Sequence, residues 1–288
     1  MQYYYKLKLL IRDAISIVFY IFLICRRFIA NSKEKGLRIL VYHSIKNVPK
    51  INDPLRMTVS EELFKKQINY LINSGYKILS LDSIIEYISG GKNITGKEIA
   101  ITFDDGFEDN LDAAANVLKK KGLTSAFFLT ADYINLDKIF PWCEKNGNFS
   151  KPLTLVMAIK LLSLHMTIGS HTSTHANLGL INPDSDKLYN EITGSKMKLE
   201  EKLGIKIKYF AYPYGNSTSF NKITENIIKN SGYSAAFTNI FGENKKGDNL
   251  FELKRTRITW NDTLFKFRIK LAGAFDWVDK VKSSRKPK

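Results

Sequence analysis

The chain has 288 residues, of which 44% are hydrophobic and 12% aromatic, which is enough for one sizeable core and excludes intrinsic disorder for most of it. Two cysteines are too few for a disulfide framework, so packing has to stabilise the fold. The chain carries 44 Lys and Arg against 28 Asp and Glu, a net charge of +16 that favours a polyanionic partner such as nucleic acid or an anionic membrane surface.

An unbroken apolar run, residues 14–25 (AISIVFYIFLIC), lies near the N-terminus between basic residues. The run is short for a spanning helix, which needs about 20 residues, and the following CRRF offers no small-residue cleavage site. Residues 1–36 are therefore expected to form a membrane-associated helical segment, and the alternative is a helix packed on the globular domain. Denser positive charge after the run favours the cytoplasmic face of the inner membrane.

From Leu37 onward, short β-branched or apolar runs alternate with longer amphipathic ones. The predicted strands are 37–42, 77–80, 98–103, 125–129, 166–169, 207–211 and 234–238, and the predicted helices follow Ser60, open at Asp82 and Asp109, and lie near 154–164, 184–203 and 218–230. This alternation predicts one domain, residues 37–262, around a largely parallel sheet, either open or closed into a barrel. Functional residues of such folds lie in loops at the carboxyl ends of the strands.

Two adjacent carboxylates, Asp104 and Asp105, follow strand 98–103 in the sequence TFDDG. Neighbouring side chains that leave an extended strand point in different directions, so one carboxylate could bind a metal while the other faces a substrate. The alternative is that the pair caps the next helix or forms a turn.

Two histidines four residues apart, His171 and His175, follow strand 166–169 in the sequence SHTSTH. That spacing puts both imidazoles on one face of a helical turn, from which they can reach one metal ion. Two structural histidines bonded to hydroxyls are the alternative. Because the chain has only four histidines, the spacing favours a metal site.

A stiff turn, YPYG at residues 212–215, follows strand 207–211. Pro213 fixes one φ angle and Gly215 permits an unusual one, so the backbone amides of the turn are held in place. The Tyr214 N–H could then stabilise a developing oxyanion, although such a turn can also be an ordinary loop.

Together, TFDDG, SHTSTH and YPYG make residues 37–260 resemble the polysaccharide deacetylases, also known as carbohydrate esterase family 4 or the NodB-homology group. The resemblance implies a distorted (β/α) barrel and a divalent metal, commonly zinc, held by Asp105, His171 and His175. It also implies that Asp104 is the general base that activates water for attack on an acetyl carbonyl. The oxyanion would be met by the metal and by the Tyr214 amide.

Two positions depart from the pattern of the family. Most members carry the histidine that acts as general acid in a late Leu-x-His motif, whereas this chain has no histidine after His175. Permuted members, which resemble the biofilm-polysaccharide deacetylases, have a Tyr-His after the first strand, so we expect His43 to protonate the leaving amine. The alternative is that His43 only forms a hydrogen bond at the barrel rim.

The second departure is Ala211, where many members have an arginine that orients the base. Arg255 or Arg257, in LKRTRI, could supply this guanidinium, and a solvated basic edge strand is the alternative. Tyr212 and Pro213, beside Ala211, are expected to help orient the substrate.

Residues 263–288 form a basic, aromatic segment that we expect to pack on the barrel with a membrane-facing edge. No recognised nucleic-acid-binding motif is present, so we expect no nucleic acid partner. The prediction is a membrane-associated, metal-dependent hydrolase that removes acetyl groups from N-acetylated sugars of a glycan or a lipid-linked glycan precursor. The alternatives are an O-acetyl esterase acting on a polysaccharide and a membrane-bound, glycan-binding pseudoenzyme.

Overall fold

The computed structural model describes residues 2–29, 36–47, 53, 56–91, 93–136, 138–144, 150–183 and 185–279. A sheet of parallel strands runs in the order β10-β1-β5-β6-β7-β8-β9, and β4 pairs with β5 beside this path. The strands are β1 (Arg38–Tyr42), β4 (Lys77–Ile78), β5 (Glu98–Phe103), β6 (Ala126–Leu129), β7 (Thr167–Ser170), β8 (Tyr209–Ala211), β9 (Ala235–Phe237) and β10 (Thr256–Arg257).

The seven strands predicted from the sequence are all present, with ends that differ by no more than two residues. The sequence did not predict β10 or the small separate pair of β2 (Ser44–Ile45) and β3 (Thr58–Val59). Each of these three strands has only two residues, which is too short to show an alternating pattern.

The sheet closes into a distorted barrel through the segment that precedes β10. Phe237 in β9 pairs with Leu253 in a parallel bridge, and Thr256, three residues further on, pairs with Leu40 in β1. β9 and β1 are therefore joined by the irregular stretch of chain that leads into β10. This stretch carries Arg255 into the barrel interior.

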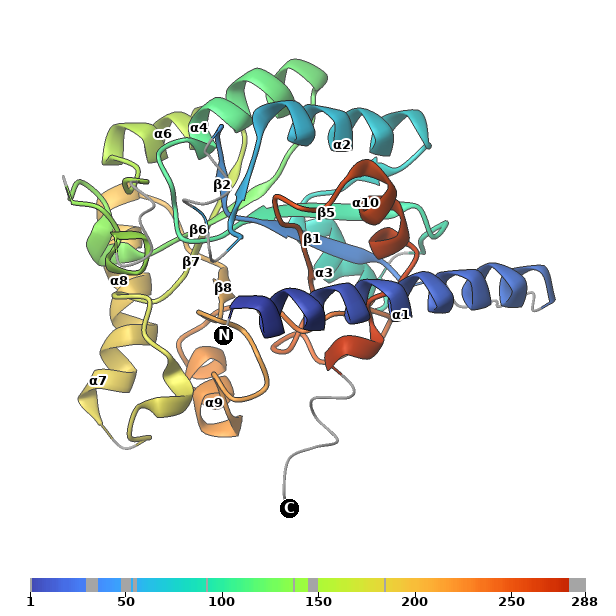
Figure 1. The fold of residues 1–288 in the computed structure, drawn as a ribbon. Coiled ribbons are helices and arrows are strands. Elements are labelled where there is room, and N and C mark those ends of the chain that lie inside the picture. The colour runs from blue at the N-terminus through green and yellow to red at the C-terminus, as the bar shows by residue number, and fades with distance from the viewer. Residues whose placement is uncertain are drawn as a thin grey trace.

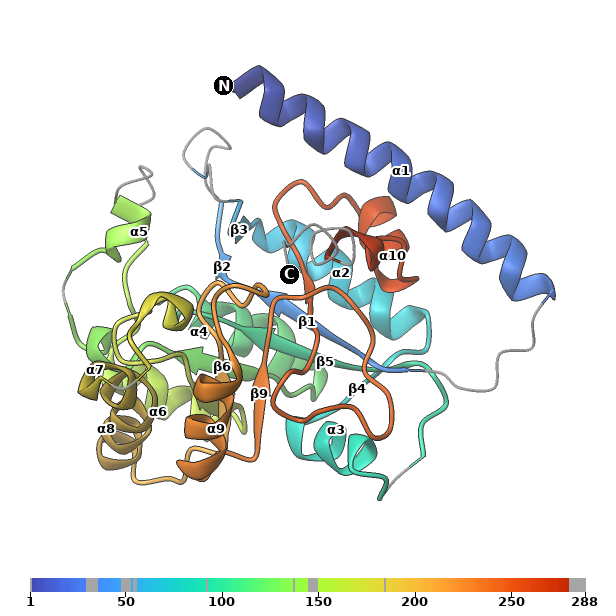
Figure 2. The same cartoon turned by 90° about the horizontal axis from the view of Figure 1, so that it is seen from below.

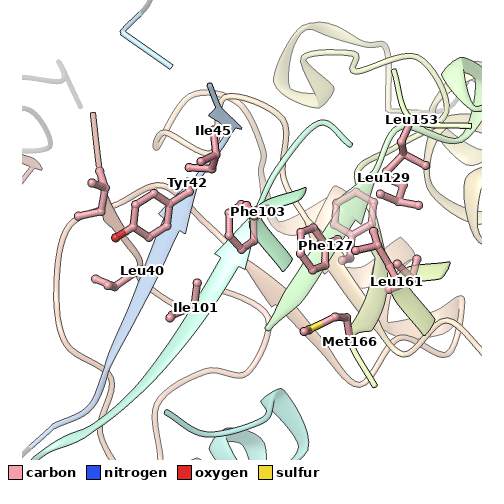
Figure 3. Close-up of a cluster of buried hydrophobic side chains, with 14 of the residues drawn as sticks. Leu40, Tyr42, Ile45, Ile101, Phe103, Phe127, Leu129, Leu153, Leu161 and Met166 are labelled. Carbon is pink, nitrogen blue, oxygen red and sulfur yellow. The ribbon is translucent and has the colours of Figure 1, made fainter. Parts of the chain in front are cut away.

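Alternation along the strands separates two apolar layers. Outward-facing side chains such as Phe103 and Phe127, whose rings stack with centroids 4.6 Å apart, pack in the larger core cluster, which also includes buried side chains of the surrounding helices (Figure 3). The other residues of the same strands, such as Ala100 and Phe128, belong to a second cluster inside the barrel. Side chains alternate along the strand, so Asp104 faces the barrel interior, as Ala100 and Thr102 do.

Helices surround the barrel, with α2, α4 and α6 grouped on one side of it (Figure 1). The helices are α1 (Gln2–Ile29), α2 (Glu61–Asn73), α3 (Leu81–Ile88), α4 (Asn110–Ala113), α5 (Pro141–Glu144), α6 (Leu155–Ser163), α7 (Asp186–Tyr189), α8 (Ser195–Leu203), α9 (Lys222–Asn230) and α10 (Leu264–Leu271). The predicted start of α3 at Asp82 is wrong, because Ser80 caps this helix and Asp82 instead accepts hydrogen bonds from Tyr209 and Lys208.

The N-terminal helix α1 lies against the outside of the domain, with α10 between it and the barrel (Figure 2). Lys266 forms an ion pair of 2.8 Å with Asp13, and the Trp277 indole N–H donates to the buried Ser16 hydroxyl at 3.1 Å. One face of α1 is thus packed on the domain. Among the described residues, no helix is both long enough and apolar enough to cross a membrane.

The C-terminal segment packs on the barrel through Phe267, Ile269 and Phe275. Arg38 at the start of β1 forms a two-point ion pair with Asp276, with N–O distances of 3.0 and 2.7 Å. Residues 280–288, like the basic residues Lys33 and Lys35, fall outside the described part of the chain.

Candidate metal centre

Three side chains from two strand ends meet in one buried cluster. Asp105 follows β5, while His171 and His175 lie in the loop after β7, and their ligand atoms all lie within 4.8 Å of one another. The Nε2 atoms of both histidines are 3.3 Å from the same carboxylate oxygen, Oδ1 of Asp105. The structure therefore brings together the three residues that the resemblance assigned to the metal.

Hydrogen bonding indicates which atoms of the cluster face a cation. Nδ1 of His171 lies 2.8 Å from the Ala211 carbonyl oxygen, which can only accept, so this nitrogen carries the proton when the ring is neutral. The Nε2 lone pair then faces Asp105, whose two oxygens have no hydrogen-bond partner among the described residues. Lone pairs this close repel each other unless positive charge lies between them, so the three residues fit a divalent ion.

The pKa shifts also indicate a demand for positive charge at this place. Burial alone would raise the pKa of Asp105, but the neighbouring histidines hold it well below its usual range. Burial alone would lower the pKa of His171, yet the two aspartates raise it above its usual value. Both directions mean that the buried carboxylates favour a neighbouring cation, which a proton or a metal ion can supply.

The backbone of the site is strained. Asp105, Thr172, His175 and Tyr214 have positive φ angles between 61° and 73°, although none of them is glycine. Such strain persists where the surrounding structure fixes it, and it concentrates at functional sites. Gly215, next to Tyr214, also has a positive φ of 57°, and a Cβ there would lie 2.5 Å from the Asn239 nitrogen.

A residue that the sequence did not indicate, Glu191, holds the histidine loop. The buried Glu191 carboxylate accepts from the Thr174 N–H at 2.9 Å and from the Thr174 hydroxyl at 2.6 Å. Its backbone carbonyl accepts from the Ser173 N–H at 3.1 Å. Glu191 lies in a π-helical turn, Asn190–Gly194, which is a widening of the helix that no sequence pattern announced.

Replacement of Glu191 with Ala is expected to lower zinc affinity by about 10- to 100-fold, since Thr174 loses both partners and His175 its fixed position. Glu191→Gln should restore most of this affinity, because the amide can accept from the Thr174 N–H and donate to its hydroxyl. Competition with a zinc-binding dye measures both. Glu200→Ala removes a carboxylate that accepts from the Ile207 N–H and serves as the control. Zinc affinity in Glu191→Ala equal to that of the unchanged protein would contradict this role.

Asp104 forms a two-point ion pair with Arg255, and both side chains are fully buried. The guanidinium nitrogens lie 2.7 and 2.6 Å from the two carboxylate oxygens, and Nε of Arg255 donates to the Thr238 carbonyl at 2.7 Å. Burial alone would raise the pKa of Asp104, but Arg255, His171 and His43 together outweigh burial and keep this pKa below its usual range. Asp104 is therefore a fixed, ionised carboxylate beside the cluster.

His43 follows β1 and is buried at the same end of the barrel. Both aspartates act on it electrostatically, Asp105 more strongly than Asp104, and both raise its pKa. Burial has the larger effect and leaves the pKa of His43 below its usual value. The Asn110 side chain donates to the His43 carbonyl at 2.7 Å, and the Asp109 carboxylate accepts from the Ile45 N–H at 2.7 Å.

The remaining predicted site residues differ in where their side chains lie. The Tyr214 ring is half exposed beside His175, with centroids 5.1 Å apart, and the ring of Trp142, which the sequence analysis missed, stacks on His175 at 4.2 Å. The Tyr212 side chain lies in the core, where its hydroxyl donates to the Phe251 carbonyl, and its expected part in orienting the substrate stays a prediction.

The last two predicted residues are Pro213 and Arg257. Pro213 is buried and its carbonyl accepts from the Gly215 N–H. Arg257 lies in β10 with an exposed side chain, and Arg255 is the arginine that contacts Asp104.

A family model and a bacterial protein match the sequence of this chain. The family model described as polysaccharide deacetylase matches residues 91–236. YxkH of Bacillus subtilis (strain 168), which has a provisional polysaccharide deacetylase name, is 25% identical over 232 residues, covering 81% of this chain and 75% of that protein. The segment that the family model matches contains Asp104 and the three cluster residues, whereas His43 and Arg255 lie outside it.

Solved structures share the fold over most of the chain. The Streptococcus pyogenes deacetylase PplD in complex with acetate has a TM-score of 0.71 at 23% identity, covering 83% of this chain and 99% of that chain. IcaB from Ammonifex degensii has a TM-score of 0.69 at 25% identity, covering 84% of this chain and 97% of that chain.

Proposed function

The chain belongs to the polysaccharide deacetylase family, and we propose that it removes acetyl groups from N-acetylated sugars of a glycan or of a lipid-linked glycan precursor. The observation that carries the proposal is the buried Asp104–Arg255 pair beside the Asp105, His171 and His175 cluster. A divalent ion bound there, for which we propose zinc, would polarise an acetyl carbonyl and acidify water.

Asp104 is proposed to take the proton from the attacking water. Its carboxylate is ionised because Arg255 lowers its pKa, and the two-point contact with this arginine fixes the plane of the carboxylate. The Tyr214 N–H is proposed to stabilise the negative charge that develops on the carbonyl oxygen, since the strained turn holds this amide in place.

His43 is proposed to protonate the leaving amine. Its burial lowers its pKa, so the neutral imidazole prevails at pH 7 before substrate binds. Negative charge that develops on the substrate would raise the pKa of His43 and favour its protonated form during the reaction. The contacts of Asn110 and Asp109 fix the segment that carries this histidine.

We expect His43→Ala to lower kcat on an N-acetyl sugar by at least about tenfold and to leave the metal content unchanged. A substrate with a good leaving group, such as a nitrophenyl acetate, should lose far less activity, because its leaving group needs no proton. Steady-state kinetics on the two substrates measure the difference. Equal losses on both would exclude His43 as the acid and would favour O-acetyl ester hydrolysis, in which the leaving alcohol depends less on an acid.

An acetate-release assay tests the proposed activity as a whole. The full chain is incubated with N-acetylglucosamine oligomers, lipid-linked N-acetyl sugars and acetylated xylan, each with and without a chelator. Chelator-sensitive acetate release from an N-acetyl substrate is expected. Release from xylan alone would favour the O-acetyl esterase, and binding without release from any substrate would favour the pseudoenzyme.

We also propose that the protein binds an anionic membrane surface, on the cytoplasmic face of the inner membrane. The net charge of +16 and the apolar, basic-flanked run at residues 14–25 support this location. Fractionation of cells followed by protease treatment of spheroplasts tests it, since a cytoplasmic protein is protected until the membrane is opened.

A further inference from the structure

The side of α1 that does not contact the domain carries a continuous row of apolar side chains. Their exposed fractions lie between 43% and 68%, which is unusual for so many large apolar residues on one helix. We call this row the outward stripe, and it consists of Leu7, Leu10, Ile11, Ile15, Val18, Ile21 and Phe22. The spacing of three and four residues keeps the row on one face of the helix.

The opposite face of α1 is fixed to the domain. Asp13, which bonds to Lys266, and Ser16, which bonds to Trp277, lie on this face, and the Tyr20 ring packs edge-on against Phe265 with centroids 6.5 Å apart. α1 is therefore not a loosely tethered anchor. Its outward stripe has a set orientation relative to the barrel.

The helix α10, on which α1 packs, also has exposed apolar residues. Leu264 and Phe265, at the start of α10, are 37% and 53% exposed, and Arg268 on the same helix is also exposed. Phe265 contacts Tyr20 on the domain-facing side of α1, so these exposed residues of α10 border α1 and do not extend the outward stripe itself.

Charge identifies the occupant of the outward stripe. Among residues 1–29 the only acidic residue is Asp13, and it is paired with Arg12 and Lys266, whereas Lys8 is exposed beside the stripe and Arg26 and Arg27 follow it in the sequence. An apolar stripe with basic ends suits anionic lipid headgroups. A second copy of the chain would instead bring two molecules of net charge +16 together.

We propose that the outward stripe lies in the interfacial layer of an anionic lipid bilayer, with the axis of α1 parallel to the membrane plane. This inference deepens the proposed membrane association and rests on it. It names the surface that binds.

The packing of α1 on the domain also fixes how the barrel is oriented relative to the proposed membrane surface. In both views α1 runs opposite to β1, so its N-terminal half lies toward the side to which the strands point (Figures 1 and 2). The cluster of Asp105, His171 and His175 lies at that end of the strands. A bilayer on the outward stripe would therefore lie on the α1 side of the barrel, with the carboxyl ends of the strands toward the N-terminal half of α1.

Vesicle co-sedimentation of the full chain tests the surface. Leu10→Glu with Val18→Glu should weaken binding to phosphatidylcholine–phosphatidylglycerol vesicles by about tenfold or more, since two charges enter the stripe. Val156→Glu with Leu180→Glu is the matched control, because these residues are 77% and 82% exposed, far from α1 in the sequence, and the charge change is the same.

Each outcome decides the inference. Lost binding in the stripe variant with intact binding in the control supports it, as does weaker binding of the unchanged protein to vesicles without phosphatidylglycerol. Unchanged binding of the stripe variant overturns it. Dimers that the stripe substitutions dissociate, without vesicle binding, would assign the surface to a second copy.

Acetate release from soluble N-acetylglucosamine oligomers separates this inference from the proposed function. The stripe variant should keep this activity, because α1 does not contact the cluster. Vesicle binding without any acetate release would refute the proposed activity and leave the membrane surface standing. Point variants are used because removal of α1 would expose Phe275 and leave Lys266 without Asp13.

Discussion

Asp104→Asn is expected to lower deacetylase activity by about 10²- to 10⁴-fold while the protein keeps about one divalent ion per chain. An amide in place of the carboxylate cannot take a proton from water, whereas Asp105, His171 and His175 remain to hold the ion. Acetate release and elemental analysis of the same sample measure the two effects. Loss of metal with the activity would mean that Asp104 and Asp105 have exchanged roles.

The stability of the variant has to be separated from its chemistry. Asp104→Asn leaves the Arg255 guanidinium buried without a counter-charge, and breaking a buried pair in this way costs about 3–5 kcal/mol. The double variant Asp104→Asn with Arg255→Met removes both charges and should unfold at a higher temperature than Asp104→Asn. It should remain as inactive, because a base is still missing. Asp276→Asn, which breaks the distant pair with Arg38, should lower stability without lowering activity.

The cluster could be predicted because its residues obey a topological rule. Asp105 lies two residues after β5 and His171 directly after β7, and parallel strands bring their carboxyl ends to one side of the sheet. His43 follows the same rule, since β1 pairs with β5 along its whole length. Strand topology is enough to place these residues at one end of the sheet, whereas the assignment of Asp105, rather than Asp104, to the metal was implied by the family resemblance.

The sequence narrowed the arginine that contacts Asp104 to Arg255 or Arg257, but it could not decide between them. Arg255 and Arg257 are two positions apart, so a regular strand would put both on the same face. In the structure β10 begins only at Thr256, and the Arg255 N–H donates to the Ile240 carbonyl, which turns this residue into the barrel. A strand of only two residues that follows an irregular stretch of chain cannot be recognised from the sequence pattern.

Glu191 and the buried lysines were missed for a different reason. Glu191 is an acidic residue in a helix 17 residues beyond Thr174, and only the folded helix shows that it caps the histidine loop. Lys266 and Lys270 belong to the basic segment that was expected to pack on the barrel with a membrane-facing edge, and both are buried in ion pairs with Asp262. Pairing between residues on separate elements is decided by packing, which composition and spacing do not encode.

His171→Ala is expected to reduce the bound metal of the purified protein from about one ion per chain to a small fraction and to abolish chelator-sensitive acetate release. The imidazole is lost from a site with three protein ligands, and the Ala211 carbonyl loses its donor. His165→Asn is the matched control, because His165 is exposed, has a positive φ of 63° that asparagine tolerates, and lies outside the cluster.

A thermal shift makes the metal prediction independent of activity. An ion that binds the folded chain and not the unfolded one raises Tm, so zinc added to chelator-treated protein should stabilise the unchanged chain and His165→Asn. His171→Ala should gain little, because the remaining Asp105 and His175 hold zinc weakly. If His171→Ala retained the full metal content and the full thermal shift, the ion would have to be bound elsewhere, and the pairing of His171 Nδ1 with Ala211 would be a purely structural contact.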